Sequence, residues 1–220
     1  MNDCRKNCLV YAVTDRSWLR GKSLAEQVEA AIVGGATMVQ LREKTLKGAA
    51  LETAAREVQE VCARYGVPFI VNDDAALAVR IGADGVHVGQ EDMEAGDVRR
   101  LVGPDRILGV TAKTVEQARA AEAAGADYLG SGAVFGSSTK KDAKPMTPAQ
   151  FAEICSSVKI PVVAIGGIHA GNMEQLAGCG MAGFAIVSGI FAAEDIAGAA
   201  REIRAKAEKL VSGNADDRND

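Results

Sequence analysis

The sequence predicts a single α/β domain with the (β/α)8 TIM-barrel fold. Short runs rich in Val and Ile alternate eight times with longer runs rich in Ala, Glu and Arg, as strands alternate with helices in this fold. The chain has 220 residues, and barrels commonly form one domain of about 200–250 residues. Glycine-containing segments at 34–36, 82–84, 125–127 and 180–182 precede the even-numbered strands as a weak repeat. An open doubly wound sheet is the alternative, but no G-x-G-x-x-G turn follows the first strand.

The first half of the chain supplies four strand–helix units. The strands are expected at 8–13, 39–44, 69–71 and 85–88. The helices that follow them are expected to end near 32, 65, 81 and 101. Ser23 is a suitable N-cap for the first of these helices, and Gly66 followed by Pro68 ends the second.

The second half continues the alternation. Its strands are expected at 107–110, 128–130, 162–165 and 184–187. One helix is expected at 115–124, another begins at Pro148, and the last reaches about Leu210. Residues 132–147 are too many for an ordinary turn and are rich in Ser, Thr and Lys, which predicts a functional loop. We assign 1–211 to the barrel and 212–220 to a polar, disordered tail.

Composition excludes several classes of partner. The net charge of −4 provides no basic field for nucleic acid or for an anionic membrane surface. No apolar run approaches the roughly 18–20 residues of a membrane-spanning helix, so a cytoplasmic protein is expected. The five cysteines include no C-x-x-C pair, which favours reduced thiols over a metal cluster or disulfides. Small phosphorylated molecules are the expected partners, and assembly into a homo-oligomer stays open.

Residues 39–44 form the most informative stretch. On a strand, Gln40, Arg42 and Lys44 point in one direction because side chains alternate between the two faces. A parallel strand flanked by helices is normally apolar, so an amide and two cations on one face predict an anion site. The alternative is a solvated strand end whose charges face water.

Polar residues collect where the predicted strands end, which is where active sites lie in this fold. They are Arg42, Lys44, Asn72, Asp73, Gln90, Asp92, Thr111, Lys113, Ser137, Thr139 and Lys140. Gly166, Gly167 and residues 187–189 end the seventh and eighth strands, where this fold often binds phosphate through backbone amides. We call this second group the glycine cup. Two anionic groups are therefore expected in one site.

Two carboxylates come from adjacent strand ends. Asp73 and Asp92 offer hard oxygen ligands of the kind that Mg²⁺ prefers, and Mg²⁺ would bridge diphosphate oxygens. Asp74 is better explained as the cap of the following helix. His87 lies within the fourth strand, where a core histidine with satisfied hydrogen bonds is the preferred interpretation over a ligand or base.

Six ordered motifs resemble those of the thiamine-phosphate synthase (thiamine-phosphate pyrophosphorylase) family. They are residues 40–44, 72–73, 87–92, 139–141, 164–168 and 187–188. The resemblance covers nearly the whole chain and implies a (β/α)8 barrel that joins hydroxymethylpyrimidine diphosphate to thiazole phosphate and releases diphosphate. The family usually has Ser in place of Thr111 and Pro-Thr in place of Gly136 and Ser137.

The resemblance also implies roles for individual residues. The pyrimidine diphosphate would be held by Gln40, Leu41, Arg42, Glu43, Lys44, Asn72, Thr111 and Lys140. The thiazole phosphate would be held by Ser137, Ser138, Thr139, Gly167, Val187 and Ser188. Asp73 and Asp92 would hold Mg²⁺.

The expected chemistry is stabilisation of a leaving group. Only two histidines occur, and no Ser/His/Asp or Cys/His arrangement is visible. We therefore expect Mg²⁺, Arg42 and Lys140 to offset charge on the diphosphate, with Thr111 beside them. The family resemblance implies that the substitution is dissociative. A thiazole tautomerase-like or regulatory barrel is the second hypothesis, and a non-catalytic phosphate-binding module is the third. The joint presence of the cations and both carboxylates favours the transferase.

Overall fold

The computed structural model describes residues 4–136 and 145–216, which form one closed barrel. Eight parallel strands pair in sequence order, and β8 pairs with β1 to close the sheet. The strands are β1 (Val10–Val13), β2 (Met38–Leu41), β3 (Phe69–Asn72), β4 (Gly85–Val88), β5 (Ile107–Thr111), β6 (Tyr128–Gly132), β7 (Val162–Ile165) and β8 (Gly183–Ile186). The predicted (β/α)8 fold is confirmed.

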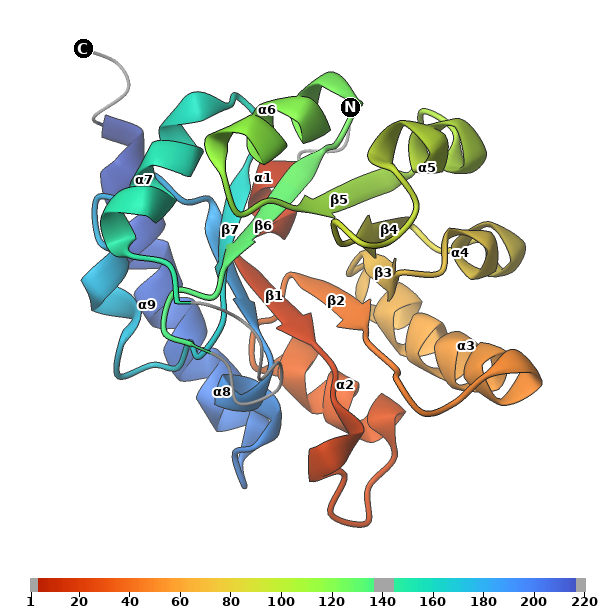
Figure 1. Ribbon diagram of the computed structural model, residues 1–220. Helices are drawn as coiled ribbons and strands as arrows, with labels where there is room; N and C mark the ends of the chain where they lie inside the picture. The colour runs from red at the N-terminus through yellow and green to blue at the C-terminus, as the bar shows by residue number, and fades with distance from the viewer. Residues whose placement is uncertain (1–3, 137–144, 217–220) are drawn as a thin grey trace.

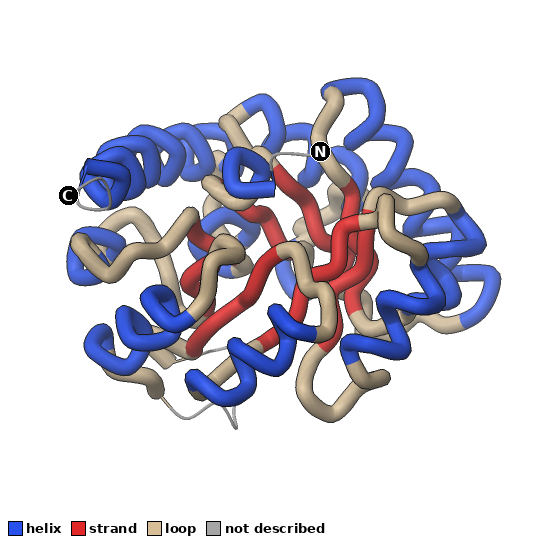
Figure 2. The backbone as a smooth tube through the Cα atoms, turned by 90° about the horizontal axis from the view of Figure 1, so that it is seen from above, coloured by secondary structure: helices blue, strands red, loops and turns tan. Residues whose placement is uncertain are grey.

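Helices surround the strands, as Figures 1 and 2 show from two directions. The α-helices are α1 (Cys4–Asn7), α2 (Leu24–Val33), α3 (Gly48–Tyr65), α4 (Ala75–Ile81), α5 (Ala95–Val102), α6 (Val115–Ala123), α7 (Pro148–Ser157), α8 (Ser188–Phe191) and α9 (Ile196–Asp216). The described part of the chain also contains the 3₁₀ helices η1 (Arg16–Trp18) and η2 (Met173–Leu176). Among the described residues, no helix is long and apolar enough to cross a membrane.

Alternate side chains of β2 enter two different cores. Met38 points into the barrel interior and packs there with Tyr11 and Tyr128. Val39 and Leu41 point outward and join the apolar layer between the strands and the helices. This alternation follows from strand geometry and leaves Arg42 and the residues after it at the carboxyl end of the barrel.

Several helix ends have the expected signals. Ser23 and Glu26 form a capping box at the start of α2, and Asp74 caps α4 by accepting from the Leu77 backbone N–H. Gly66 adopts a left-handed φ of 65° at the end of α3, a conformation that glycine reaches without strain. Pro148 occupies the first turn of α7. These local contacts confirm the predicted boundaries.

The structure differs from the expectation for individual elements, most clearly in β2, in the seventh unit and at the last helix. The second strand ends at Leu41 because the Arg42 backbone N–H leaves the ladder and donates to the Thr14 hydroxyl at 3.0 Å. The seventh unit contains the short η2 in place of an α-helix. The last helix continues to Asp216, so residues 212–216 are helical and do not begin the predicted tail. Leu210 still packs against the core near this end, which favours continuation of the helix.

Candidate active site

A cavity of about 470 Å³ opens at the carboxyl ends of the strands. Side chains and backbone from all eight strand ends line it. The lining residues that the sequence predicted as site residues are Gln40, Arg42, Lys44, Asn72, Asp73, Asp92, Thr111, Gly167, Val187 and Ser188. The structure therefore brings the predicted anion site and the glycine cup into one cavity.

Arg42 and Lys44 place two cations on one wall. Lys44 Nζ lies 2.9 Å from Asp73 Oδ2, and Arg42 Nη1 lies 3.7 Å from Asp15 Oδ2. The Arg42 backbone N–H donates to the Thr14 hydroxyl, and the Arg42 side chain is 23% exposed. Both cations therefore have a carboxylate neighbour and still face the cavity, where an anionic ligand can reach them.

Asp73 and Asp92 form a carboxylate pair beside these cations. Burial raises the pKa of Asp92, the Gly89 backbone N–H opposes that shift with a 2.7 Å hydrogen bond, and the adjacent Asp73 raises the pKa further. Asp73 has a left-handed φ of 65°, which is uncommon for a residue other than glycine. Two close carboxylates are an unfavourable arrangement unless a cation or a proton joins them.

His87 lies at the floor of the cavity with both ring nitrogens engaged. Nδ1 contacts the Tyr128 hydroxyl and Nε2 contacts the Thr111 hydroxyl, each at 3.0 Å. Burial lowers the pKa of His87 to about 4, and the nearby Asp73 partly opposes this shift. Both ring nitrogens are satisfied, as expected for a core histidine, while the ring also lines the cavity; the ring is neutral at pH 7.

The glycine cup consists of the segments that directly follow β7 and β8. Gly166 and Gly167 have φ values of 102° and 65°, and Ser188 begins α8. A Cβ atom at Gly167 would lie 2.7 Å from the Phe135 carbonyl oxygen, so only glycine fits there. Asn172 Nδ2 donates to the Gly167 carbonyl oxygen at 2.9 Å and fixes this turn.

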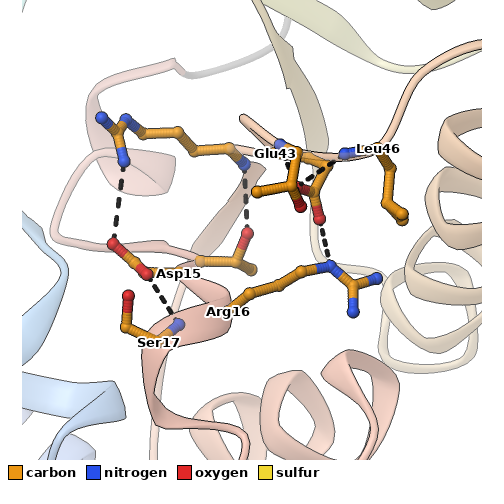
Figure 3. A network of polar contacts seen from close by, with 8 residues as sticks. Asp15, Arg16, Ser17, Glu43 and Leu46 are labelled. Atoms are coloured by element: carbon orange, nitrogen blue, oxygen red, sulfur yellow. Dashed lines mark hydrogen bonds and ion pairs between the residues drawn. The ribbon is translucent and has the colours of Figure 1, made fainter.

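Two residues expected to contact substrate do not line the cavity. Leu41 is 2% exposed and packs in the outer apolar layer. The Glu43 carboxylate forms an ion pair with Arg16 and accepts backbone N–H bonds from Thr45 and Leu46 (Figure 3). Once the chain leaves the strand at Leu41, strand alternation no longer decides which way Glu43 points.

Part of the predicted site lies outside the described residues. Ser137, Ser138, Thr139 and Lys140 belong to the segment 137–144, so their expected roles stay predictions. Gly132 and Ala133 line the cavity just before that segment.

Sequence reasoning missed Tyr11 and Asn172. Tyr11 lies within a buried strand and has the pattern of a core residue, yet its hydroxyl reaches the cavity floor. Its position two residues before the end of β1 is the signal that could have identified it, because inward-facing residues near that end reach the site. No local pattern distinguishes Asn172 as the residue that holds the Gly167 turn.

The fold and the cavity together define a (β/α)8 barrel enzyme that acts on small molecules. The model of the family described as thiamine monophosphate synthase matches residues 10–190. The chain is 41% identical to a thiamine-phosphate synthase of Clostridium tetani (strain Massachusetts / E88), over 92% of this chain and 97% of that protein. It is 46% identical to the thiamine-phosphate synthase of Clostridium novyi (strain NT), over 90% of this chain and 97% of that protein.

A solved structure agrees with these relatives. Thiamine phosphate pyrophosphorylase from Pyrococcus furiosus superposes with a TM-score of 0.87 at 35% identity, covering 95% of this chain and 100% of that one. The chain belongs to the thiamine monophosphate synthase family. Its activity is that of a thiamine-phosphate synthase, a transferase of thiamine biosynthesis.

Proposed function

We propose that this cavity condenses hydroxymethylpyrimidine diphosphate with thiazole phosphate, with Mg²⁺ bound at the carboxylate pair. The observation that carries the proposal is that the cations Arg42 and Lys44 and the glycine cup line the same cavity of about 470 Å³. Two anionic substrates can then lie in contact with each other, which favours a bimolecular reaction by fixing the reacting groups.

The two walls of the cavity receive different substrates in this proposal. Gln40, Arg42, Lys44, Asn72 and Thr111 hold the pyrimidine diphosphate. Gly167, Val187 and Ser188 hold the thiazole phosphate, since backbone N–H groups and a hydroxyl suit a phosphate monoester. Ser137, Ser138, Thr139 and Lys140 complete these two sets from the segment outside the described residues.

The carboxylate pair suits Mg²⁺. Asp73 and Asp92 supply hard oxygen ligands, and the pKa of Asp92 is raised by burial and by the neighbouring Asp73. A bound divalent cation would offset the charge of this carboxylate pair. Within the described residues, no group of three or more His, Cys, Asp and Glu side chains could hold a metal ion by itself. Two carboxylates, with substrate oxygens and water completing the shell, are the usual protein contribution to a Mg²⁺ site. When bound, Mg²⁺ would offset charge on the diphosphate oxygens.

The protein's own groups stabilise charge on the leaving group. The bond between the pyrimidine methylene carbon and the diphosphate oxygen breaks, and its electron pair leaves with the diphosphate. Arg42 and Lys44 then face more negative charge than in the bound substrate, and this difference lowers the barrier. The thiazole nitrogen donates its electron pair to the methylene carbon. His87 takes no proton in this scheme because both of its nitrogens are already engaged.

A thiazole tautomerase-like or regulatory barrel would need the glycine cup but no diphosphate site. Arg42, Lys44, Asn72, Asp73 and Asp92 all line the cavity, which favours the transferase. One experiment separates the alternatives: purified protein is incubated with both substrates and Mg²⁺, and thiamine phosphate and diphosphate are quantified. We expect equal amounts of the two products, and none when a chelator is added. Isomerised thiazole phosphate without diphosphate release would instead identify a tautomerase, and binding without turnover would identify a regulatory module.

A further inference from the structure

A continuous series of hydrogen bonds crosses the floor of the cavity. Gln40 Nε2 donates to the Tyr11 hydroxyl at 2.6 Å, and the Tyr11 and Tyr128 hydroxyls lie 2.7 Å apart. His87 joins Tyr128 to Thr111 through its two ring nitrogens, each at 3.0 Å. We call these five side chains the floor network. Its two ends, Gln40 and Thr111, line the cavity, whereas Tyr128 is fully buried and is not a lining residue.

The orientation of the Gln40 amide, together with the protons of the two phenols, fixes the direction of the hydrogen bonds in the floor network. Burial raises the pKa of Tyr11 and of Tyr128 far above the ordinary phenol value, so each phenol keeps one proton to donate. Because the Gln40 amide N–H donates to the Tyr11 oxygen, the Tyr11 proton goes to Tyr128, and the Tyr128 proton goes to His87 Nδ1. With Gln40 in this orientation, any other order leaves a buried phenol proton without an acceptor, which is unfavourable.

This direction selects one form of the His87 ring. Nδ1 accepts, so the neutral ring carries its proton on Nε2 and donates it to the Thr111 hydroxyl oxygen. The Thr111 hydroxyl proton is then free to point into the cavity. At the other end, Gln40 lines the cavity and uses its amide nitrogen toward Tyr11, which leaves its carbonyl oxygen to accept from a ligand.

We infer that the floor network is a positioning device that sets the hydrogen-bonding character of both ends of one substrate site. Thr111 is held as a donor to a phosphate oxygen, and Gln40 is held as an acceptor for an amino group on a heterocycle. A substrate with an anionic group at one end and a ring amine at the other matches both ends. The identity of the ligand rests on the proposed function. The direction of the hydrogen bonds in the floor network does not.

Gly109 supports the floor network from β5. A Cβ atom at Gly109 would overlap the Tyr128 ring and His87 Nδ1. Glycine within a strand is otherwise unfavourable, and here it lets the ring and the imidazole approach. The hydrogen bond between Tyr128 and His87 therefore depends on a missing side chain in a neighbouring strand.

Nitrogen NMR of the imidazole tests the direction without any substrate. The chain has two histidines, and His169 is exposed and does not line the cavity. The change His169→Gln therefore leaves only the signals of the two His87 ring nitrogens. At neutral pH we expect the shift of a protonated nitrogen at Nε2 and of an unprotonated nitrogen at Nδ1. Adding Tyr128→Phe removes the donor to Nδ1 and should move the two shifts toward each other as the two tautomers mix. The matched change Tyr65→Phe removes a hydroxyl that donates to Glu29 elsewhere and should leave them unchanged.

Two NMR results would overturn the inference. A protonated Nδ1 would mean that Gln40 is turned the other way and that every bond of the network runs in reverse, which overturns the inference. Unchanged shifts in Tyr128→Phe would overturn it as well. If Tyr128→Phe is too unstable to study, the protonation of the two His87 ring nitrogens in the His169→Gln protein decides the direction by itself.

Kinetics then test whether Tyr128 acts through Thr111. Tyr128→Phe should lower kcat/KM for the pyrimidine diphosphate roughly three- to tenfold, the range that one neutral hydrogen bond accounts for. Thr111→Val should lower it further, Thr111→Ser should restore activity, and Tyr128→Phe should have little additional effect in the Thr111→Val protein. Independent, multiplicative losses would contradict the inference. Absence of synthesis by the unaltered protein would instead refute the proposed function and leave the NMR test intact.

Discussion

Arg16 and Glu43 form an ion pair that joins the segment after β1 to the segment after β2 (Figure 3). The Glu43 side chain is 2% exposed, and Thr45 and Leu46 also donate to its carboxylate. Glu43 therefore shapes the segment that carries Arg42 and Lys44, and does so without lining the cavity. We therefore expect Glu43 to position those cations.

The first prediction concerns the stability of this ion pair. Although burial opposes ionisation, hydrogen bonds from Thr45, Arg16 and Leu46 lower the pKa of Glu43 to about 2. A folded-state pKa below the unfolded value stabilises the protein at neutral pH, and that contribution is lost as the pH falls from about 4.5 toward 2. Glu43→Gln should thus reduce the free energy of unfolding at pH 7 by roughly 2–4 kcal/mol and flatten its acid dependence.

Chemical denaturation at a series of pH values measures this effect. Glu29→Gln is the matched control because Glu29 pairs with Arg64 on the surface, where both side chains are largely exposed. Equal losses in the two variants would contradict a special role for Glu43.

The second prediction concerns the glycine cup. Gly167→Val is a poor probe of phosphate binding, because its Cβ would press on the Phe135 carbonyl and its φ of 65° would be strained. We expect it to destabilise the fold. Ser188→Ala keeps the backbone and should weaken thiazole-phosphate binding roughly tenfold while pyrimidine-diphosphate binding is kept. Calorimetric titration of each ligand measures both, and unchanged thiazole-phosphate affinity would remove Ser188 from the site.

The third prediction separates two adjacent aspartates. Asp74 accepts from the Leu77 backbone N–H at 2.8 Å and caps α4, whereas Asp73 lines the cavity. Asp74→Ala should cost about 1 kcal/mol of stability, as loss of an N-cap does, and leave the Mg²⁺ requirement of synthesis unchanged. Ser23→Ala removes a comparable cap from α2 and serves as the control. A changed metal requirement in Asp74→Ala with intact stability would argue against this division of roles.

The barrel was predictable because its strands are short apolar runs bounded by glycine and polar residues. Strands β4 and β7 have the predicted bounds, Gly85–Val88 and Val162–Ile165. The end of β2 was not predictable in the same way. Arg42 leaves the ladder for the Thr14 hydroxyl, a contact between distant parts of the chain that no local periodicity displays.

The candidate site was predictable to the extent that strand ends converge in this fold. Asn72, Asp73, Asp92 and Thr111 all line the cavity as that rule requires. Glu43 was misplaced because its partner Arg16 comes from the preceding unit. The floor network was missed because Tyr11 and Tyr128 sit in apolar strands, and only their three-dimensional proximity shows that their hydroxyls meet.

The most direct test of the account is the dependence of product formation on Mg²⁺ concentration in three proteins: the unaltered protein, Asp73→Asn and Asp92→Asn. Each substitution removes a charge and nearly preserves shape, so we expect the fold to survive and kcat/KM to collapse. Partial recovery at high Mg²⁺ is expected because one carboxylate remains in each variant. Metal-independent synthesis by all three proteins would contradict the assignment of Asp73 and Asp92 as the Mg²⁺ site.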